Sequence, residues 1–233
     1  MQKSRKSFPL RALILAGGYG QRLWPLTKNT PKPMLEILGK PCLEWVIEHL
    51  ERYGIKETII YTHYKAKIIT DYFKNRVSYN FTPELSGTCQ TIYRLREWLT
   101  AKSDSFLVVN GDTISNIDLN FLIKEHKKNK AQITAFYKAN TANIDNARNY
   151  CGFMIIQKSA LTAIKKHYNI ETLFEKRNLS HPYPLPSIYL VNDVNWYYFD
   201  IGKDITSRND FVEFLNNEIR RYELLKPWFK NIK

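Results

Sequence analysis

The feature that most constrains this chain is a glycine-rich turn that directly follows a short apolar run. Residues 12–16 are all apolar and predict a buried strand. Residues 17–20 read Gly-Gly-Tyr-Gly, which lets the backbone bend tightly and bring its N–H groups close to an anion. Arg22 and Lys32 add two positive charges just beyond the turn. A strand, a glycine turn and two cations together predict a cradle for a triphosphate.

Two other glycine-rich phosphate motifs do not fit this turn. A dinucleotide-binding fingerprint needs a further glycine three residues after Gly20, where Leu23 stands. It also needs an acidic residue at the end of the second strand, but the next predicted strand runs into Tyr-Thr-His at residues 61–63. A P-loop needs Gly-Lys-Ser/Thr after four spacer residues, and the chain lacks it. An ordinary strand-to-helix turn is the remaining alternative, and the long pattern that continues to Lys32 argues against it.

That pattern resembles a family signature. Residues 15–27 read Leu-Ala-Gly-Gly-Tyr-Gly-Gln-Arg-Leu-Trp-Pro-Leu-Thr, and residues 31–33 read Pro-Lys-Pro. The sugar-phosphate nucleotidylyltransferases share this signature, with threonine where this chain has Gln21. The chain is similar to their glucose-1-phosphate thymidylyltransferases and heptose-phosphate guanylyltransferases. The resemblance implies a Rossmann-like α/β fold with a doubly wound, mostly parallel sheet, and transfer of a nucleoside monophosphate from a nucleoside triphosphate to a sugar 1-phosphate.

The remaining segments alternate between helices and strands, which independently favours a doubly wound, mostly parallel sheet. Predicted strands cover residues 57–61, 77–81, 105–110, 132–138, 151–156, 187–191 and 195–199. Predicted helices cover residues 40–53, 65–74, 119–128, 158–168 and 207–225, and another follows the loop at 83–91 and ends near residue 99. We expect a basic tail (1–10) and a single domain (11–233), with a nucleotide half (11–130), an acceptor half (131–206) and a C-terminal helix (207–226).

Two aspartates follow predicted strands. Asp112 comes just past the apolar strand at residues 105–110, where a carboxylate points into the ligand crevice of an open α/β sheet; capping of the next turn is the alternative. The resemblance implies that Asp112 and Asp200 hold Mg²⁺, the cofactor expected here because a hard cation takes oxygen ligands. Asp118 precedes an apolar helical stretch and predicts a helix N-cap.

The resemblance also assigns roles around the nucleotide. Gly87 would approach the base, and Gln90 would read a base edge, because an amide both donates and accepts; a plain turn before a helix is the alternative. Arg22 would stabilise the departing pyrophosphate through its fork of donors, and Lys32 would contact the α-phosphate. No general base is needed, since the acceptor phosphate is already anionic. The expected nucleotide-binding residues are Leu15, Ala16, Gly17, Gly18, Gly20, Gln21, Gly87, Gln90, Asn110 and Gly111.

The acceptor region departs from the family pattern. Relatives carry a Glu-Glu-Lys-Pro segment that contacts the sugar and its phosphate, whereas residues 139–150 here are a short polar run without it. Another cation must then offset the acceptor phosphate. Lys138 and Arg148 are the candidates, with solvated surface charge as the alternative. Gly152 and Glu171 match substrate-facing positions of relatives. We therefore expect an open acceptor site that suits a larger sugar or a polyol phosphate.

Composition adds limits on partners and compartment. The net charge is +13, but the lysines are spread along the chain without the interleaved aromatic residues that favour nucleic acid. No apolar run reaches the length of a membrane helix. Three isolated cysteines favour reduced thiols in a cytoplasmic protein. We expect no nucleic acid or membrane partner; a homo-oligomer is compatible with the sequence. A nucleotide-binding regulatory subunit remains the alternative to an active enzyme.

Overall fold

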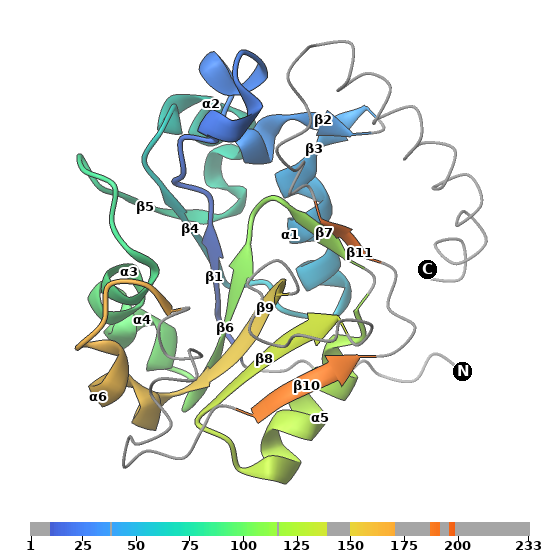
Figure 1. Cartoon of the computed structure of the whole chain (residues 1–233), viewed down its shortest axis with the longest axis vertical. Coiled ribbons are helices and arrows are strands. Elements are labelled where there is room, and N and C mark those ends of the chain that lie inside the picture. Colours follow the sequence, from blue (N-terminus) through green and yellow to red (C-terminus); the bar gives the residue numbers. More distant parts are fainter. Residues whose placement is uncertain are drawn as a thin grey trace, which may run out of the picture.

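The computed structural model describes residues 10–37, 39–115, 117–138, 150–170, 187–191 and 196–198. Across this part of the chain a seven-stranded sheet runs in the order β10-β8-β9-β6-β1-β4-β5, with helices on both sides (Figure 1). Only β9 (Tyr150–Gln157) runs antiparallel to its neighbours. The other pairs are parallel. The fold is therefore α/β with a mostly parallel sheet, which confirms the predicted class.

The strands of this sheet lie close to their predicted positions. Besides β9 they are β1 (Ala12–Leu15), β4 (Thr58–Thr62), β5 (Ser78–Phe81), β6 (Ser105–Asn110), β8 (Ile133–Lys138) and β10 (Ser187–Val191). Two small ladders add β2 (Glu36–Ile37) with β3 (Lys40–Pro41) and β7 (Thr113–Ser115) with β11 (Trp196–Tyr198). The first ladder and β7 were not predicted, because two- or three-residue strands carry no readable alternation.

Two layers of helix enclose the sheet, one on each face. Alternate strand residues point to opposite faces, so on β1 Ile14 belongs to one apolar core and Leu13 to the other. The first core packs α1 (Cys42–Arg52), α2 (Ala66–Phe73) and α5 (Leu119–Asn129) against the sheet. The second packs α3 (Thr88–Arg94), α4 (Arg96–Thr100) and α6 (Leu161–Ile164). The sheet is doubly wound, as predicted.

Several helix boundaries differ from the prediction. Helix α1 begins at Cys42 rather than residue 40, because Lys40 and Pro41 pair with β2 across a turn at Gly39, whose φ is 81°. The helix predicted to end near residue 99 is interrupted at Leu95, which separates α3 from α4. The helix predicted over 158–168 contains only four α-helical residues, after the 3-10 turn η6 (Lys158–Ala160).

Asp118 caps the helix that follows it, as predicted. The Asp118 side chain accepts hydrogen bonds from the backbone N–H groups of Asn120 and Phe121, so it is the predicted N-cap of α5. The helix predicted over 207–225 lies outside the described residues. Across the described residues, none of the helices is long and apolar enough to cross a bilayer.

Candidate functional site

The glycine turn follows β1 and is fastened at both ends. The Ala16 N–H donates to the carbonyl of Tyr61 on β4 at 2.9 Å. At the far end Gly20 has a φ of 63°, a left-handed conformation that is costly for residues with a Cβ. Its carbonyl accepts hydrogen bonds from the Thr27 hydroxyl at 2.7 Å and from the Leu23 N–H at 2.9 Å. The backbone of the turn is therefore held in place without a ligand.

Only one of the three glycines faces open space. A Cβ on Gly17 would lie 2.5 Å from the Tyr61 ring, and one on Gly20 would lie 3.3 Å from the Cβ of Lys32. A Cβ on Gly18 would meet nothing within 4 Å, and Gly18 is exposed. The turn is thus packed on its flanks and open at Gly18, which leaves the backbone there accessible to an anion.

The two predicted charged groups Lys32 and Asp112 meet beside this turn. The backbone N–H of Gly111 donates to the Leu15 carbonyl at 2.9 Å, and a Cβ on Gly111 would lie 3.3 Å from that of Ala16. This close approach holds the end of β6, and hence Asp112, against the end of β1. Lys32 lies in the 3-10 turn η3 (Lys32–Met34), and its Nζ is 2.9 Å from Oδ2 of Asp112. The side chains are 18% and 25% exposed, respectively.

A buried thiol lies within the field of this ion pair. Burial raises the pKa of Cys42 well above its usual value; Asp112 raises it further, and Lys32 opposes the change. The thiol therefore stays protonated and cannot act as a nucleophile or thiolate ligand. Cys42 and Cys89 are both buried, and neither forms a disulfide within the described part of the chain.

The predicted base-binding residues lie at the start of α3. Gln90 is exposed, and its Oε1 accepts a long hydrogen bond of 3.4 Å from the Gly87 N–H. Because the amide oxygen faces that donor, the NH₂ group of Gln90 is the part left to meet a ligand. A Cβ on Gly87 would collide with the backbone oxygen of Tyr168, whose carbonyl also accepts from Cys89 N–H at 3.0 Å. Packing alone thus already demands glycine at position 87.

Sequence reasoning missed an aromatic group beside the turn. The Tyr19 hydroxyl lies 2.9 Å from Nε2 of His63, and Nδ1 of His63 lies 2.8 Å from the Thr82 carbonyl. The carbonyl can only accept, so Nδ1 carries a proton, and in the neutral imidazole Nε2 then accepts from the Tyr19 hydroxyl. The Tyr64 hydroxyl donates to the Lys28 carbonyl at 2.6 Å. The sequence pattern could have predicted this contact. Parallel strands β1 and β4 end at the same edge of the sheet, so the residues at the carboxyl end of β4 lie beside the glycine turn that follows β1.

Several predicted site residues are described only in part or not at all. Residues 148, 171 and 200 lie outside the described residues, so the expectations for Arg148, Glu171 and Asp200 are untested. The backbones of Arg22 and Lys138 are described, in the 3-10 turn η1 (Gln21–Leu23) and at the end of β8. Within the described part of the chain, no three His, Cys, Asp or Glu side chains gather as a metal cluster would.

Gly152, predicted to face the acceptor, lies at the start of β9 with a φ of 72°. A Cβ there would lie 2.7 Å from the Thr113 hydroxyl oxygen. That oxygen is buried and has no hydrogen-bond partner among the residues that the structure describes. Because Gly152 has no Cβ, β9 can pass close to Thr113, the residue that follows Asp112. The predicted site residues Gly152 and Asp112 therefore lie near each other.

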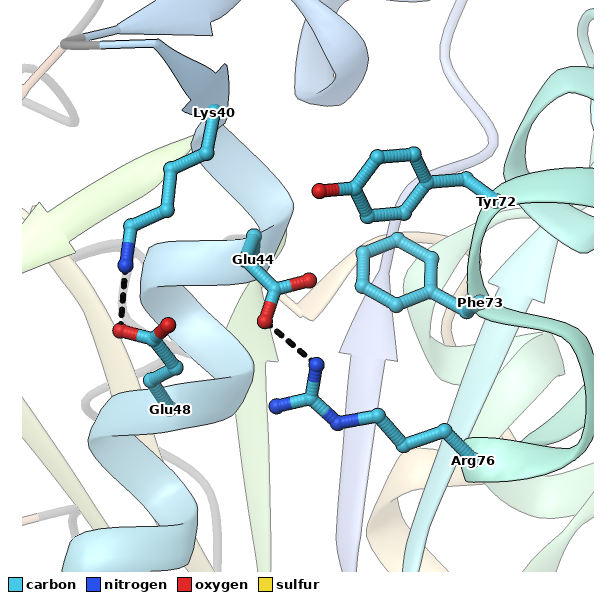
Figure 2. A pocket seen from close by; sticks show the side chains of 6 residues that line it. All are labelled: Lys40, Glu44, Glu48, Tyr72, Phe73 and Arg76. Atoms are coloured by element: carbon cyan, nitrogen blue, oxygen red, sulfur yellow. Dashed lines mark hydrogen bonds and ion pairs between the residues drawn. The ribbon is translucent and has the colours of Figure 1, made fainter.

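A pocket of about 450 Å³ lies between α1 and α2, away from the glycine turn (Figure 2). Two ion pairs form part of its wall. Lys40 Nζ lies 2.5 Å from Glu48 Oε2, and Arg76 pairs with Glu44 on the neighbouring turn of α1. These opposite charges offset one another, and no residue of the glycine turn lines the pocket. We therefore assign the candidate site to the turn and the Lys32–Asp112 pair.

The chain is similar to known nucleotidyl transferases. Residues 11–210 match the family model of nucleotidyl transferases. The chain is 38% identical over 144 residues to D-glycero-alpha-D-manno-heptose 1-phosphate guanylyltransferase of Campylobacter jejuni, which covers 58% of this chain and 64% of that protein. It is 34% identical over 125 residues to the mannose-1-phosphate guanylyltransferase catalytic subunit beta of Xenopus tropicalis, covering 51% of this chain and 35% of that protein. The chain thus spans less than two thirds of these curated relatives.

Solved structures show the same fold. The chain superposes on HddC from Yersinia pseudotuberculosis, in a structure complexed with GMP-PN, with a TM-score of 0.65 and 23% identity. That superposition covers 89% of this chain and 99% of the other. At this identity the likeness establishes the fold, while the family rests on the model that matches 200 residues here. On that match the chain belongs to the nucleotidyl transferase family.

Proposed function

We propose that this protein transfers a nucleoside monophosphate from a nucleoside triphosphate to a sugar 1-phosphate or a related phosphate, with release of pyrophosphate. The product would be an activated sugar for the synthesis of a surface glycan. One observation carries the proposal: the Lys32–Asp112 ion pair stands beside a glycine turn whose exposed position, Gly18, faces open space. A cation, a carboxylate and accessible backbone N–H groups are the parts that nucleotidyl transfer requires.

Charge neutralisation and positioning are the main demands of phosphoryl chemistry. The backbone of residues 17–20 would hold the β- and γ-phosphates, because the exposed position at Gly18 leaves this backbone accessible to an anion. Lys32 would contact the α-phosphate, where negative charge accumulates, exchanging its contact with Asp112 for one with substrate. Arg22 would bind the departing pyrophosphate through two parallel hydrogen bonds. The acceptor phosphate attacks as an anion, so no side chain has to remove a proton.

The residues near Asp112 fit a bound Mg²⁺. This ion is usually held by one or two carboxylates together with substrate phosphates and water, so a larger cluster is not required. Tyr198, the last residue of β11, pairs with Thr113, the residue after Asp112. Asp200 follows Tyr198 by two residues, which span at most ~7 Å of chain, and this supports Asp112 and Asp200 as the two ligands. Bound Mg²⁺ would neutralise charge on the transferring phosphoryl group.

The sheet register supports Lys138 as the cation for the acceptor phosphate. Met154 on β9 pairs with Val108 on β6 and with Ala135 on β8. Asp112 comes four residues after Val108, and Lys138 comes three residues after Ala135. Both residues therefore lie at the same end of the sheet and at a similar distance along the strand direction. They are two strand spacings apart, roughly 10 Å, and Gly152 lies on the strand between them. A phosphorylated sugar can span that distance.

The acceptor proposal has its own test. We expect Lys138→Ala to raise the KM for the acceptor much more than the KM for the nucleotide, because only the acceptor phosphate loses its cation. Arg148→Ala is the second variant, since Arg148 is the alternative cation. Initial rates at varied acceptor and fixed nucleotide measure the effect. If both variants behave like wild type, neither residue binds the acceptor.

The first substrates to test follow from the relatives and from Gln90. The relatives named above are guanylyltransferases that act on heptose 1-phosphate and mannose 1-phosphate, and the NH₂ group of Gln90 would suit a base carbonyl. We propose GTP with a heptose 1-phosphate as the first pair, followed by the other triphosphates and hexose 1-phosphates. Pyrophosphate release with mass spectrometry of the product measures turnover. Nucleotide binding without turnover across the whole panel would instead support a regulatory subunit.

A further inference from the structure

We infer that Tyr61 is a positioning residue that sets the spacing between the phosphate turn (residues 17–20) and the base loop (residues 82–87). The inference rests on the proposed function, since it concerns how one nucleotide reaches both segments. Tyr61 lies on β4 and is 3% exposed. It belongs to neither segment, but it is in contact with both, through its ring and backbone on one side and its hydroxyl on the other.

The ring and backbone of Tyr61 hold the phosphate turn. Leu15 on β1 pairs with Tyr61 in the parallel ladder, and the Tyr61 carbonyl accepts from the Ala16 N–H at 2.9 Å. The ring then lies across Gly17, so close that a Cβ there would be 2.5 Å from Cε1 and 3.1 Å from Cζ. The first residue of the phosphate turn is therefore seated on the Tyr61 ring and cannot move toward β4.

The hydroxyl of Tyr61 holds the base loop through a directional chain of hydrogen bonds. The Thr82 hydroxyl donates to the Glu84 carbonyl at 2.6 Å, and this uses its only hydrogen. The Tyr61 hydroxyl, 3.2 Å from Thr82 Oγ1, must then be the donor to it. The Tyr61 oxygen in turn accepts from the Ser86 N–H at 2.7 Å. Each hydroxyl hydrogen in this series of hydrogen bonds has one acceptor, so the base loop has a defined position relative to the Tyr61 ring.

This arrangement matters for a nucleotide and not for a bare polyphosphate. A nucleotide bound with its phosphates at residues 17–20 can place its base beside Gln90 only if the loop before α3 lies at the correct distance. Tyr61 touches both segments directly, through the Gly17 position and through Ser86 and Thr82. His63 also contacts both, through the Tyr19 hydroxyl and the Thr82 carbonyl, and Tyr61→Phe leaves those contacts in place. A ligand made of phosphates alone needs the turn but not the spacing, so the two ligands should respond differently when the hydroxyl is removed.

Tyr61→Phe isolates the hydroxyl, because it keeps the ring against Gly17 and leaves the Ser86 N–H without its acceptor. We expect the dissociation constant for the preferred nucleoside triphosphate to rise about 10-fold, because without these hydrogen bonds only about a tenth of the molecules hold the base loop in its binding position, with a smaller preference among the four bases. Binding of tripolyphosphate should stay within about twofold of wild type. Isothermal titration calorimetry on the full chain, with Mg²⁺ present, measures both. Tyr79→Phe is the matched control: Tyr79 lies on the neighbouring strand β5, and its hydroxyl donates to the Lys74 carbonyl at 2.7 Å, away from both segments.

Each outcome bears on the inference. Wild-type nucleotide affinity and base preference in Tyr61→Phe would overturn it, as would an equal loss for nucleotide and tripolyphosphate, which would mean that Tyr61 shapes only the turn. If Tyr61→Phe does not fold, Thr82→Val carries the same expectation from the loop side, because it removes the acceptor of the Tyr61 hydroxyl. Absence of triphosphate binding in the wild type would refute the proposed function, and the inference with it.

Discussion

Replacing Gly18 with valine should abolish nucleotide binding without destabilising the fold. Gly18 is exposed, and an added Cβ would meet nothing within 4 Å. Its φ is outside the left-handed range, unlike that of Gly20, so a side chain causes no backbone strain. The new side chain would project from the open face of the turn, where we place the phosphates, and would keep them away from the backbone N–H groups.

The expected magnitudes differ between folding and binding. Replacing an unstrained glycine reduces the conformational entropy of the unfolded chain, so the free energy of unfolding of Gly18→Val should be unchanged or higher by up to about 1 kcal/mol. Charge-assisted hydrogen bonds contribute about 1.5–3 kcal/mol each, so each lost bond to phosphate should weaken binding at least about 10-fold. The contrasting variant is Gly17→Ala, whose Cβ would lie 2.5 Å from the Tyr61 ring. Overpacking of that kind costs about 1–3 kcal/mol.

The assay pairs urea denaturation with calorimetric titration of a nucleoside triphosphate in the presence of Mg²⁺. We expect Gly18→Val to fold like wild type and to show no measurable binding, whereas Gly17→Ala should unfold at lower urea. Normal nucleotide affinity in Gly18→Val would show that the turn is only a connection between β1 and the residues after it. If both variants were destabilised equally, other atoms of the protein would have to occupy the space in front of Gly18 in solution, contrary to the structure.

Three further predictions concern charge. Asp112→Asn and Asp200→Asn should each keep the circular dichroism spectrum of the wild type and lower the rate on the order of 10²–10³; full turnover in either variant, or with excess chelator, would contradict the metal assignment. Arg22→Lys keeps the charge but loses the bidentate fork, so turnover should fall substantially, and an unchanged rate would show that the fork is not used. Burial lowers the pKa of His49 and of His126 from 6.5 to about 4. The unfolded chain therefore binds protons that the native state excludes, so stability is fully present above pH 6.5 and declines toward pH 4. The loss is about 2 kcal/mol per histidine at pH 5 relative to pH 7, and equal urea midpoints at the two pH values would refute it.

Local sequence pattern was sufficient to predict much of the fold. Strand positions followed from apolar runs, because a strand buried on both faces is mostly apolar, as residues 106–109 of β6 are. The turn that we propose as the phosphate site was predicted from its three glycines, because backbone contact with an anion requires the space that a Cβ would fill. The predicted helix start at residue 40 was wrong, because Lys40 and Pro41 pair with β2 instead. A two-residue pairing across a turn produces no periodic pattern in the sequence from which it could be predicted.

Only the tertiary structure decided which residues meet. Lys32 and Asp112 are separated by 80 positions in sequence, and their ion pair exists because β6 is placed next to β1 in the sheet. In the sequence, Tyr61 was notable only because the strand that it ends lacks the acidic residue of a dinucleotide-binding fingerprint. In the fold, its ring contacts the phosphate turn and its hydroxyl contacts the loop before α3. The sequence determines which backbone conformations and which burial patterns are possible, since these are local properties. Strand order brings distant side chains within hydrogen-bonding distance, and that order is a property of the whole sheet.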